Sequence, residues 1–208
     1  MNSNEKILEL IYSVENAGGI HGEQWEKLKN AVCENIQEET AKRNGVKKEL
    51  NIIKKMLKSN QKNFNDRFLG FFKVGGRFAF LDGHRVLLSE NNFGFAEDPQ
   101  NAEGFKALEQ IATLPADATE EIEISLAECK RQIAENKAAK NMLKPLVINC
   151  DGFRVGINPQ FAKDAIEFTG SNKFLFEKKV NARGCNITPL YQLTGGNVAT
   201  VTLPVNIN

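Results

Sequence analysis

The first third of the chain has apolar side chains at helical spacing. In residues 4 to 17, isoleucine, leucine and valine recur every three or four positions, and Gly18-Gly19 ends the run. A second run extends from about residue 22 to residue 60, with a break at Asn44-Gly45. This pattern predicts either one long helix or a helical hairpin over residues 22 to 60.

From about residue 64 the pattern changes to short apolar runs between turn signals. Residues 68–74, 77–80 and 85–88 predict three strands of a meander, joined at Gly75-Gly76 and Asp82-Gly83. Phenylalanine is dense here, and we expect it to fill a core. Stacking on nucleic-acid bases is the alternative, although few basic residues are close. The residues concerned are Phe64, Phe68, Phe71, Phe72, Phe78 and Phe80.

The next part of the chain is predicted to be a loop and two helices with a strand between them. Residues 91–99 are typical of a loop, and residues 103–111 predict a short amphipathic helix. A short strand follows at residues 121–124. Ser125-Leu-Ala-Glu128 fits a capping box, which predicts a helix from Leu126 to about Leu143.

The last quarter predicts a hairpin, a helix and three further strands. Strands at 145–149 and 153–157 flank a tight turn, and a helix begins at Asn158-Pro159, a good N-cap followed by proline at the first helical position. Strands follow at 173–176, 186–193 and 198–203. We expect this helix to lie across the sheet, and we expect strands 145–157 and 198–207 to share one layer.

The order helix-then-meander therefore occurs twice, at residues 4–90 and 121–208. This order predicts an α+β fold, in which each half has a helical layer on an antiparallel sheet. We interpret residues 1–208 as a single domain. Its first half is 1–115, with a helical extension at about 20–62 and a meander at 64–90, and its second half is 116–208.

Composition and cysteine spacing exclude several classes of protein. No apolar run approaches the roughly 18 residues that cross a bilayer, and the N-terminus lacks the features of a signal peptide, so we expect a cytoplasmic protein and no membrane partner. The four cysteines are widely spaced and the chain has two histidines. We therefore expect free thiols and no metal. No nucleotide-binding fingerprint is present, so we expect no cofactor.

The net charge of +1 hides a segregation of charge along the chain. Residues 41–62 carry eight basic side chains and one acidic, whereas residues 90–130 carry ten acidic side chains and two basic. Such segregation can form a face for a polyanion. It can equally form two halves of one internal charge pairing.

Two segments resemble the bacterial beta sliding clamp. The segment FAFLDGHRVLLSE at residues 78–90 resembles the clamp strand pair that carries ATDGHRLA. The segments GINPQFAKDAIEF at 156–168 and VTLPVNI at 201–207 resemble the closing half of the last clamp domain, whose tail reads Met-Pro-x-Arg-Leu. Here the tail is Leu203-Pro-Val-Asn-Ile207, so the Met and the Arg are replaced. The matching segments cover less than half of the chain.

The resemblance implies a DNA-clamp-like domain with extra N-terminal helices. In clamps, helices face the DNA, sheets face outward, and a ring contains six such domains. Encircling DNA would therefore require this chain to form a homo-oligomer or to use other domains. The resemblance also implies a pocket for short linear peptides of DNA-processing proteins. Its residues would be Gly83, His84, Arg85 and Val86 on one wall and Leu203 and Pro204 on the other.

Double-stranded DNA is the second partner that the sequence predicts. Sequence-independent phosphate contact needs only displayed lysine and arginine. The alternative is an ordinary solvated helix face. The candidates are Lys47, Lys48, Lys54, Lys55, Lys58 and Lys62, together with Lys130, Arg131, Lys137 and Lys163.

Catalysis is not expected. Asp82 and His84 are the residues that come nearest to an acid–base pair, but no motif links a nucleophile to them. The sequence thus favours a non-enzymatic accessory or scaffold protein in DNA replication or related transactions. The alternative is a protein-interaction module that has the clamp fold without a DNA function.

Overall fold

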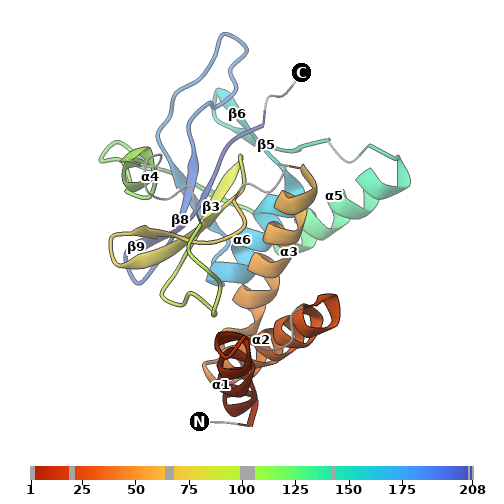
Figure 1. Cartoon of the computed structure of the whole chain (residues 1–208). Coiled ribbons are helices and arrows are strands. Elements are labelled where there is room, and N and C mark those ends of the chain that lie inside the picture. The colour runs from red at the N-terminus through yellow and green to blue at the C-terminus, as the bar shows by residue number, and fades with distance from the viewer. Residues whose placement is uncertain are drawn as a thin grey trace.

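A computed structural model describes residues 3–18, 22–63, 68–98, 106–141, 144–205 and 207. The chain folds into an α+β structure in which helices cover an antiparallel sheet, and two N-terminal helices extend from this body (Figure 1). The helices are α1 (Ser3–Asn16), α2 (Glu23–Arg43), α3 (Lys47–Asn63), α4 (Lys106–Ile111), α5 (Leu126–Ala138) and α6 (Pro159–Thr169). The strands are β1 (Phe72–Val74), β2 (Arg77–Leu81), β3 (Arg85–Ser89), β4 (Glu120–Glu123), β5 (Leu146–Cys150), β6 (Phe153–Ile157), β7 (Lys173–Phe176), β8 (Leu190–Thr194) and β9 (Asn197–Thr202).

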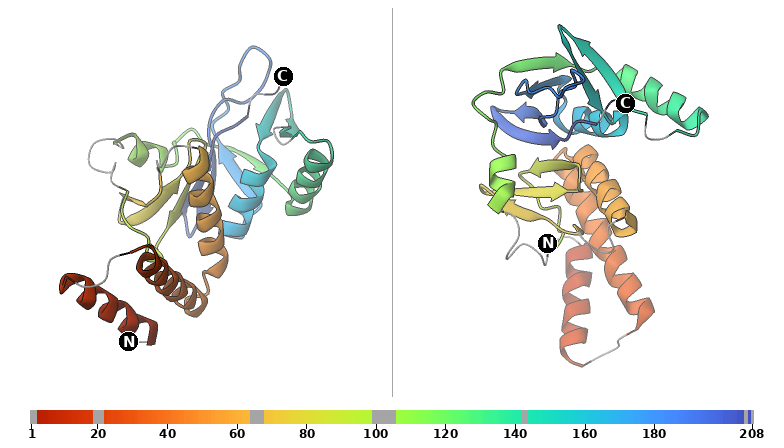
Figure 2. Two further views of the ribbon diagram at one scale, coloured as in Figure 1. Left: turned by 45° about the vertical axis from the view of Figure 1, so that its right-hand side comes forward. Right: turned by 90° about the horizontal axis from the view of Figure 1, so that it is seen from above.

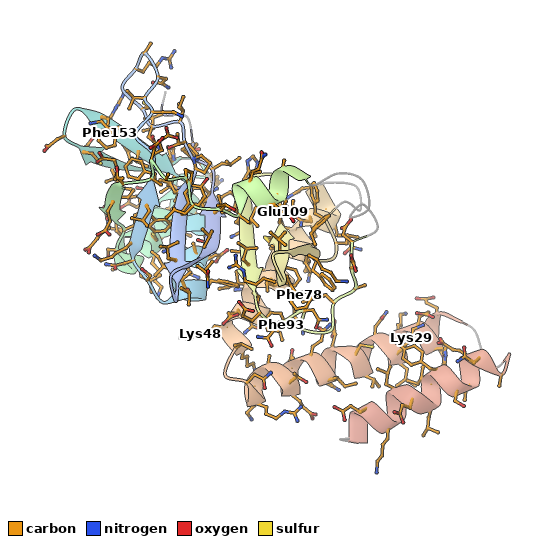
Figure 3. All side chains as sticks on the ribbon, turned by 90° about the vertical axis from the view of Figure 1, so that its left-hand side faces the viewer. Lys29, Lys48, Phe78, Phe93, Glu109 and Phe153 are labelled. Carbon is orange, nitrogen blue, oxygen red and sulfur yellow. The ribbon has the colours of Figure 1, made fainter. Side chains whose placement is uncertain are left out.

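The N-terminal extension is a helical hairpin formed by α1 and α2. Glu15 on α1 accepts hydrogen bonds from the Trp25 indole, at 3.1 Å, and from Lys29 Nζ, at 3.0 Å, both on α2. Figures 2 and 3 show this hairpin, with Lys29 in it, away from the sheet. Helix α2 ends just before Gly45, whose φ is 73°, and α3 then runs in a different direction. The predicted run over residues 22–60 is therefore two helices, and the hairpin partner of α2 is α1.

Seven strands form the main sheet in the order β1-β2-β3-β9-β8-β7-β4. The sheet is continuous because β3 from the first half pairs with β9 from the end of the chain, with Val86 opposite Val201. The two predicted halves thus share one sheet. This pairing brings the segment around Asp82 next to the C-terminal tail.

Each face of the sheet is covered by different helices. Phe80 and Leu87 pack against buried residues of α3, and Phe174 packs in one core with buried residues of α6. On the opposite face, Leu81 and Val86 pack with Leu108 of α4. The alternation of side chains along a strand explains this division, since neighbours in sequence point to opposite faces. The predicted core role of the phenylalanines is confirmed for Phe71, Phe72 and Phe80, which are buried. Phe64 lies outside the described residues.

The hairpin β5–β6 forms a separate two-stranded sheet, so the prediction that it shares one layer with residues 198–207 is wrong. Its apolar residues instead pack with α6 and the strands of the main sheet in one core. A backbone hydrogen bond joins it to the tail: the Val205 N–H donates to the Gly156 carbonyl at 2.9 Å. Gly156 permits this approach, because a Cβ there would lie 2.5 Å from the Val205 oxygen. Helix α6 does lie against the main sheet, as predicted.

Three predicted boundaries are corrected by local contacts. The strand expected at 68–74 begins only at Phe72: Phe68 has a left-handed backbone, and Phe71 pairs instead with Glu97 in an isolated bridge. Helix α5 ends at Ala138, and Lys140 also takes a positive φ, whereas the predicted end at Leu143 lies outside the described residues. Residues 186–189 form a hydrogen-bonded loop before β8. The start predicted for α4, at residue 103, lies outside the described residues.

Candidate functional site

The turn at Asp82-Gly83-His84-Arg85 is organised by the Asp82 carboxylate. Its Oδ1 accepts the backbone N–H groups of His84, at 3.0 Å, and Arg85, at 3.1 Å. Its Oδ2 accepts the Arg85 side chain through Nε, at 2.8 Å. Because Asp82 is committed to these three donors, its role is to fix the turn rather than to act as a base toward His84.

Arg85 connects this turn to α6. Its Nη1 donates to Asp164 Oδ2 at 2.7 Å, and its guanidinium carbon lies 4.4 Å from the centroid of the Phe161 ring. The His84 ring stacks on the same phenyl ring at a centroid distance of 6.0 Å. Arg85 and Asp164 are both buried. A buried charge needs such paired contacts, so this network locks the turn to the first turns of α6.

A cavity of about 220 Å³ lies beside the turn, on the sheet face that α4 covers. Apolar side chains dominate its wall, and two of them, Ile111 and Leu203, are about two-fifths exposed. The lining residues are Phe68, Leu81, Asp82, Gly83, His84, Arg85, Val86, Leu108, Ile111, Val201 and Leu203. An apolar pocket with a few fixed polar groups is the usual form of a site that takes an apolar side chain.

The structure brings five of the six residues that were predicted for the peptide pocket to this cavity. Gly83, His84, Arg85 and Val86 line one side, and Leu203 lines the other. The Leu203 N–H donates to the His84 carbonyl at 2.9 Å, which holds the tail against the turn. Pro204 is half-buried on the tail and is not part of the lining.

Sequence reasoning missed the other lining residues. Leu108 and Ile111 come from α4 and Phe68 from an irregular segment. Their placement depends on long-range packing, and none carries a motif. For Phe68 the aromatic density of the segment was the available signal. The position of Asp164 beside Arg85 has no local signal, since the two are far apart in the sequence.

The predicted DNA-contacting residues lie on three neighbouring helices. Helix α6 packs between α3 and α5 (Figures 1 and 2). Most of the ten side chains are exposed, and Lys48 lies near the start of α3 (Figure 3). Three of them are paired with carboxylates: Lys54 with Glu38, Lys163 with Glu167, and Arg131 with Glu135. The helices therefore bring the predicted cations into one layer, with acidic side chains interspersed.

The remaining titratable groups offer little chemistry. In the part of the chain that the structure describes, no group of three or more His, Cys, Asp or Glu residues could hold a metal ion. All four cysteines are free thiols. Burial raises the pKa of Cys129 to about 11, which keeps that thiol protonated and unreactive at neutral pH. None of the described helices is long and apolar enough to cross a membrane.

Comparison with known proteins found no match among family models or curated proteins and a distant one among solved structures. Among solved structures, the chain is similar to the DNA polymerase III beta subunit of Thermotoga maritima, with 14% sequence identity and a TM-score of 0.35. The match covers 64% of this chain and 42% of that one, so it spans less than half of the subunit. At this TM-score the similarity alone decides neither fold nor function.

Proposed function

We propose that this protein is a non-enzymatic, clamp-like scaffold that docks short peptides in the pocket between the Asp82 turn and the C-terminal tail. One observation carries the proposal. Residues that resemble the two pocket walls of sliding clamps meet at one cavity, although they lie at distant points of the sequence. The Leu203–His84 backbone bond and the β3–β9 pairing hold the walls together.

The lining of the pocket defines the chemistry of the peptide. Leu81, Val86 and Val201 form an apolar floor, and Leu203 and Ile111 flank it with half-exposed side chains. Burying one leucine or phenylalanine side chain there contributes about 1.5–3 kcal/mol. We therefore infer an extended peptide with one or two aliphatic or aromatic anchors, bound weakly and reversibly.

Both walls belong to a single chain. Because β3 and β9 are neighbours in one sheet, the pocket needs no second subunit. The affinity for a peptide should then not depend on self-association of the chain, whereas encircling DNA would require oligomerisation or further domains.

An NMR titration tests the peptide site. Capped pentapeptides with leucine and phenylalanine at the centre are added to the ¹⁵N-labelled chain, and the same peptides with serine at those positions serve as the control. We expect the amide signals of His84, Val86 and Leu203 to shift only with the apolar peptides. Leu203→Arg should abolish the shifts, whereas Leu10→Arg, at an exposed position on α1, should leave them unchanged. Unmoved signals in the native chain would refute the peptide site.

We propose weak DNA binding at the helix layer of α3, α6 and α5 as the second activity. The support is the exposure of most predicted cations on adjacent helices, on the opposite side of the sheet from the pocket. The alternative function is that of a protein-interaction module that does not bind DNA. The carboxylates that pair with Lys54, Lys163 and Arg131 favour this alternative. These ion pairs compete with phosphate for the same cations.

Fluorescence anisotropy with a labelled 20-base-pair duplex distinguishes a DNA-binding protein from an interaction module that does not bind DNA. Phosphate contacts predict affinity that falls steeply between about 50 and 200 mM salt. The double substitution Lys55→Glu with Lys58→Glu should remove binding, and Lys27→Glu on α2 should have little effect. Absence of binding even at the lower salt concentration would leave the interaction module as the function.

A further inference from the structure

Phe68 forms part of the pocket wall in a backbone conformation that phenylalanine rarely adopts. Its φ is 58°, in the left-handed region. For a bulky side chain this conformation costs free energy and persists only where the surroundings determine it. The ring is half-buried, lines the cavity and lies 6.3 Å from the Phe72 ring, centroid to centroid.

A buried amide on α3 holds the carbonyl of this residue. Asn60 is fully buried, and its Nδ2 donates to the Phe68 carbonyl at 2.8 Å and to the Leu81 carbonyl at 2.9 Å. Phe68 and Leu81 both line the pocket. One side chain therefore joins two separate parts of the pocket wall.

A buried carboxylate holds the residues that follow. Oδ2 of Asp98, a residue that is 3% exposed, accepts the backbone N–H groups of Leu69, at 3.0 Å, and Gly70, at 3.4 Å. Gly70 allows this approach, since a Cβ there would lie 2.4 Å from the Ala96 carbonyl oxygen. The segment 68–70 is thus fixed by Asn60 on one side and by Asp98 on the other.

Stability alone does not explain Asn60. Its Oδ1 is buried and has no hydrogen-bond partner among the described residues. A buried polar atom without a partner costs free energy that an apolar residue of similar size would avoid. What the amide provides, and a leucine would not, is a pair of donors directed at two residues of the pocket wall.

We propose that Asn60 and Asp98 are positioning residues that hold Phe68 in its left-handed conformation, so that its ring forms a fixed wall of the pocket and selects peptides with an aliphatic or aromatic anchor. The selectivity rests on the peptide-binding function proposed above. The positioning of Phe68 by Asn60 and Asp98 does not depend on that function, because it is a property of the chain without a peptide.

Urea unfolding of Asn60→Ala, Phe68→Gly and the double variant tests the positioning without a ligand. Glycine adopts φ near 58° without strain, so the amide has less to hold once residue 68 is glycine. We expect the effect of Asn60→Ala on the unfolding equilibrium constant to be at least about threefold smaller in the Phe68→Gly background. In a Phe68→Leu background, where the strain remains, the effect should equal that in the native chain. Equal effects in all three backgrounds would overturn the positioning role.

An NMR titration with the capped pentapeptide Gly-Ser-Leu-Phe-Gly tests the selectivity. Phe68→Gly, with its fold checked by the ¹H–¹⁵N spectrum, should bind about tenfold more weakly than the native chain, an outcome that a purely structural role would not produce. Asn60→Ala should weaken binding similarly, with its fold checked by the ¹H–¹⁵N spectrum, and Phe68→Leu should stay within about threefold of the native chain.

The outcomes separate the two proposals. If the native chain does not bind the pentapeptide, the peptide-binding function and the selectivity fail, and the unfolding cycle still decides the positioning. If the native chain binds and Phe68→Gly binds equally well, the wall role of Phe68 fails while the peptide site stands.

Discussion

Arg85 Nη1 and Asp164 Oδ2 are 2.7 Å apart and form a buried ion pair between the pocket turn and α6. Asp82 Oδ2 accepts the Arg85 Nε–H at 2.8 Å, so the guanidinium bridges two carboxylates. Arg85→Leu would remove the cation from the buried Asp82 carboxylate and leave Asp164 with Lys163, whose Nζ lies 3.8 Å from Asp164 Oδ1. We expect this variant to lower the free energy of unfolding by about 3–5 kcal/mol. Urea denaturation measures this loss.

Arg131 provides the matched control for Arg85. It also contacts two carboxylates, those of Glu128 and Glu135, but its side chain is 62% exposed. Arg131→Leu should cost no more than about 1 kcal/mol, because water replaces an exposed ion pair. Similar losses for the two variants would contradict the assignment of the Arg85 network as the link between the turn and α6.

Gly156→Ala is expected to displace the C-terminal tail. The added Cβ would lie 2.5 Å from the Val205 oxygen and 2.7 Å from Ile207 Cγ1, so the tail must move. We expect a loss of about 1–3 kcal/mol and shifted amide signals at Leu203. Gly22→Ala is the control, since a Cβ there meets no atom within 4 Å, and it should cost less than about 1 kcal/mol. An unshifted Leu203 signal in Gly156→Ala would argue against the tight tail packing.

Helix α6 depends on its N-cap. Asn158 Oδ1 accepts the Gln160 N–H at 2.9 Å, and Pro159 occupies the first helical position. Asn158→Ala should destabilise the chain by about 1 kcal/mol, whereas Asn158→Asp keeps the acceptor and should be close to neutral. Thermal unfolding followed by circular dichroism compares them. The capping role would be disproved by equal midpoints for the alanine and native chains.

Glu49 predicts a pH dependence of stability. Burial raises the pKa of this carboxyl, and a hydrogen bond from Ser89 Oγ, at 3.3 Å, opposes the shift. A raised folded-state pKa means that the folded chain holds the proton more tightly than the unfolded chain. Stability therefore falls as pH rises above the ordinary value of 4.5, and the penalty persists at neutral pH.

Glu49→Gln tests this linkage. The neutral amide removes the charge, so the variant should be more stable than the native chain at pH 7, and the difference should shrink as pH falls toward 4.5. Urea midpoints at several pH values measure it. Glu90→Gln, at an exposed position beyond β3, is the matched control substitution. A difference for Glu49→Gln that is constant across pH would exclude the linkage.

Local signals predicted most elements of the fold. Asn158-Pro159 and Gly170 marked the two ends of α6, and the Ser125 side chain accepts the Ala127 N–H as an N-cap should. Each of these signals acts within a few residues, so the sequence displays it directly. The pocket turn at Asp82 was recognisable for the same reason.

Long-range pairing was not predictable in the same way. Nothing near Arg85 in the sequence indicates that Asp164 neutralises it, and nothing in the hairpin pattern of β5–β6 indicates that it stays outside the main sheet. The left-handed backbone of Phe68 results from Asn60 and Asp98, which bond to this segment from elsewhere in the fold. Because β5–β6 stays outside the main sheet, the hairpin gives no support to the resemblance to sliding clamps, which rests on the Asp82 turn, α6 and the tail.

The pairing of β3 with β9 also has a consequence for biosynthesis. One wall of the pocket, in β3, is translated well before the other, at Leu203. The cavity is therefore incomplete on a nascent chain in which Leu203 has not yet been translated, however well its first half has folded. The proposed peptide docking therefore requires that translation has passed Leu203.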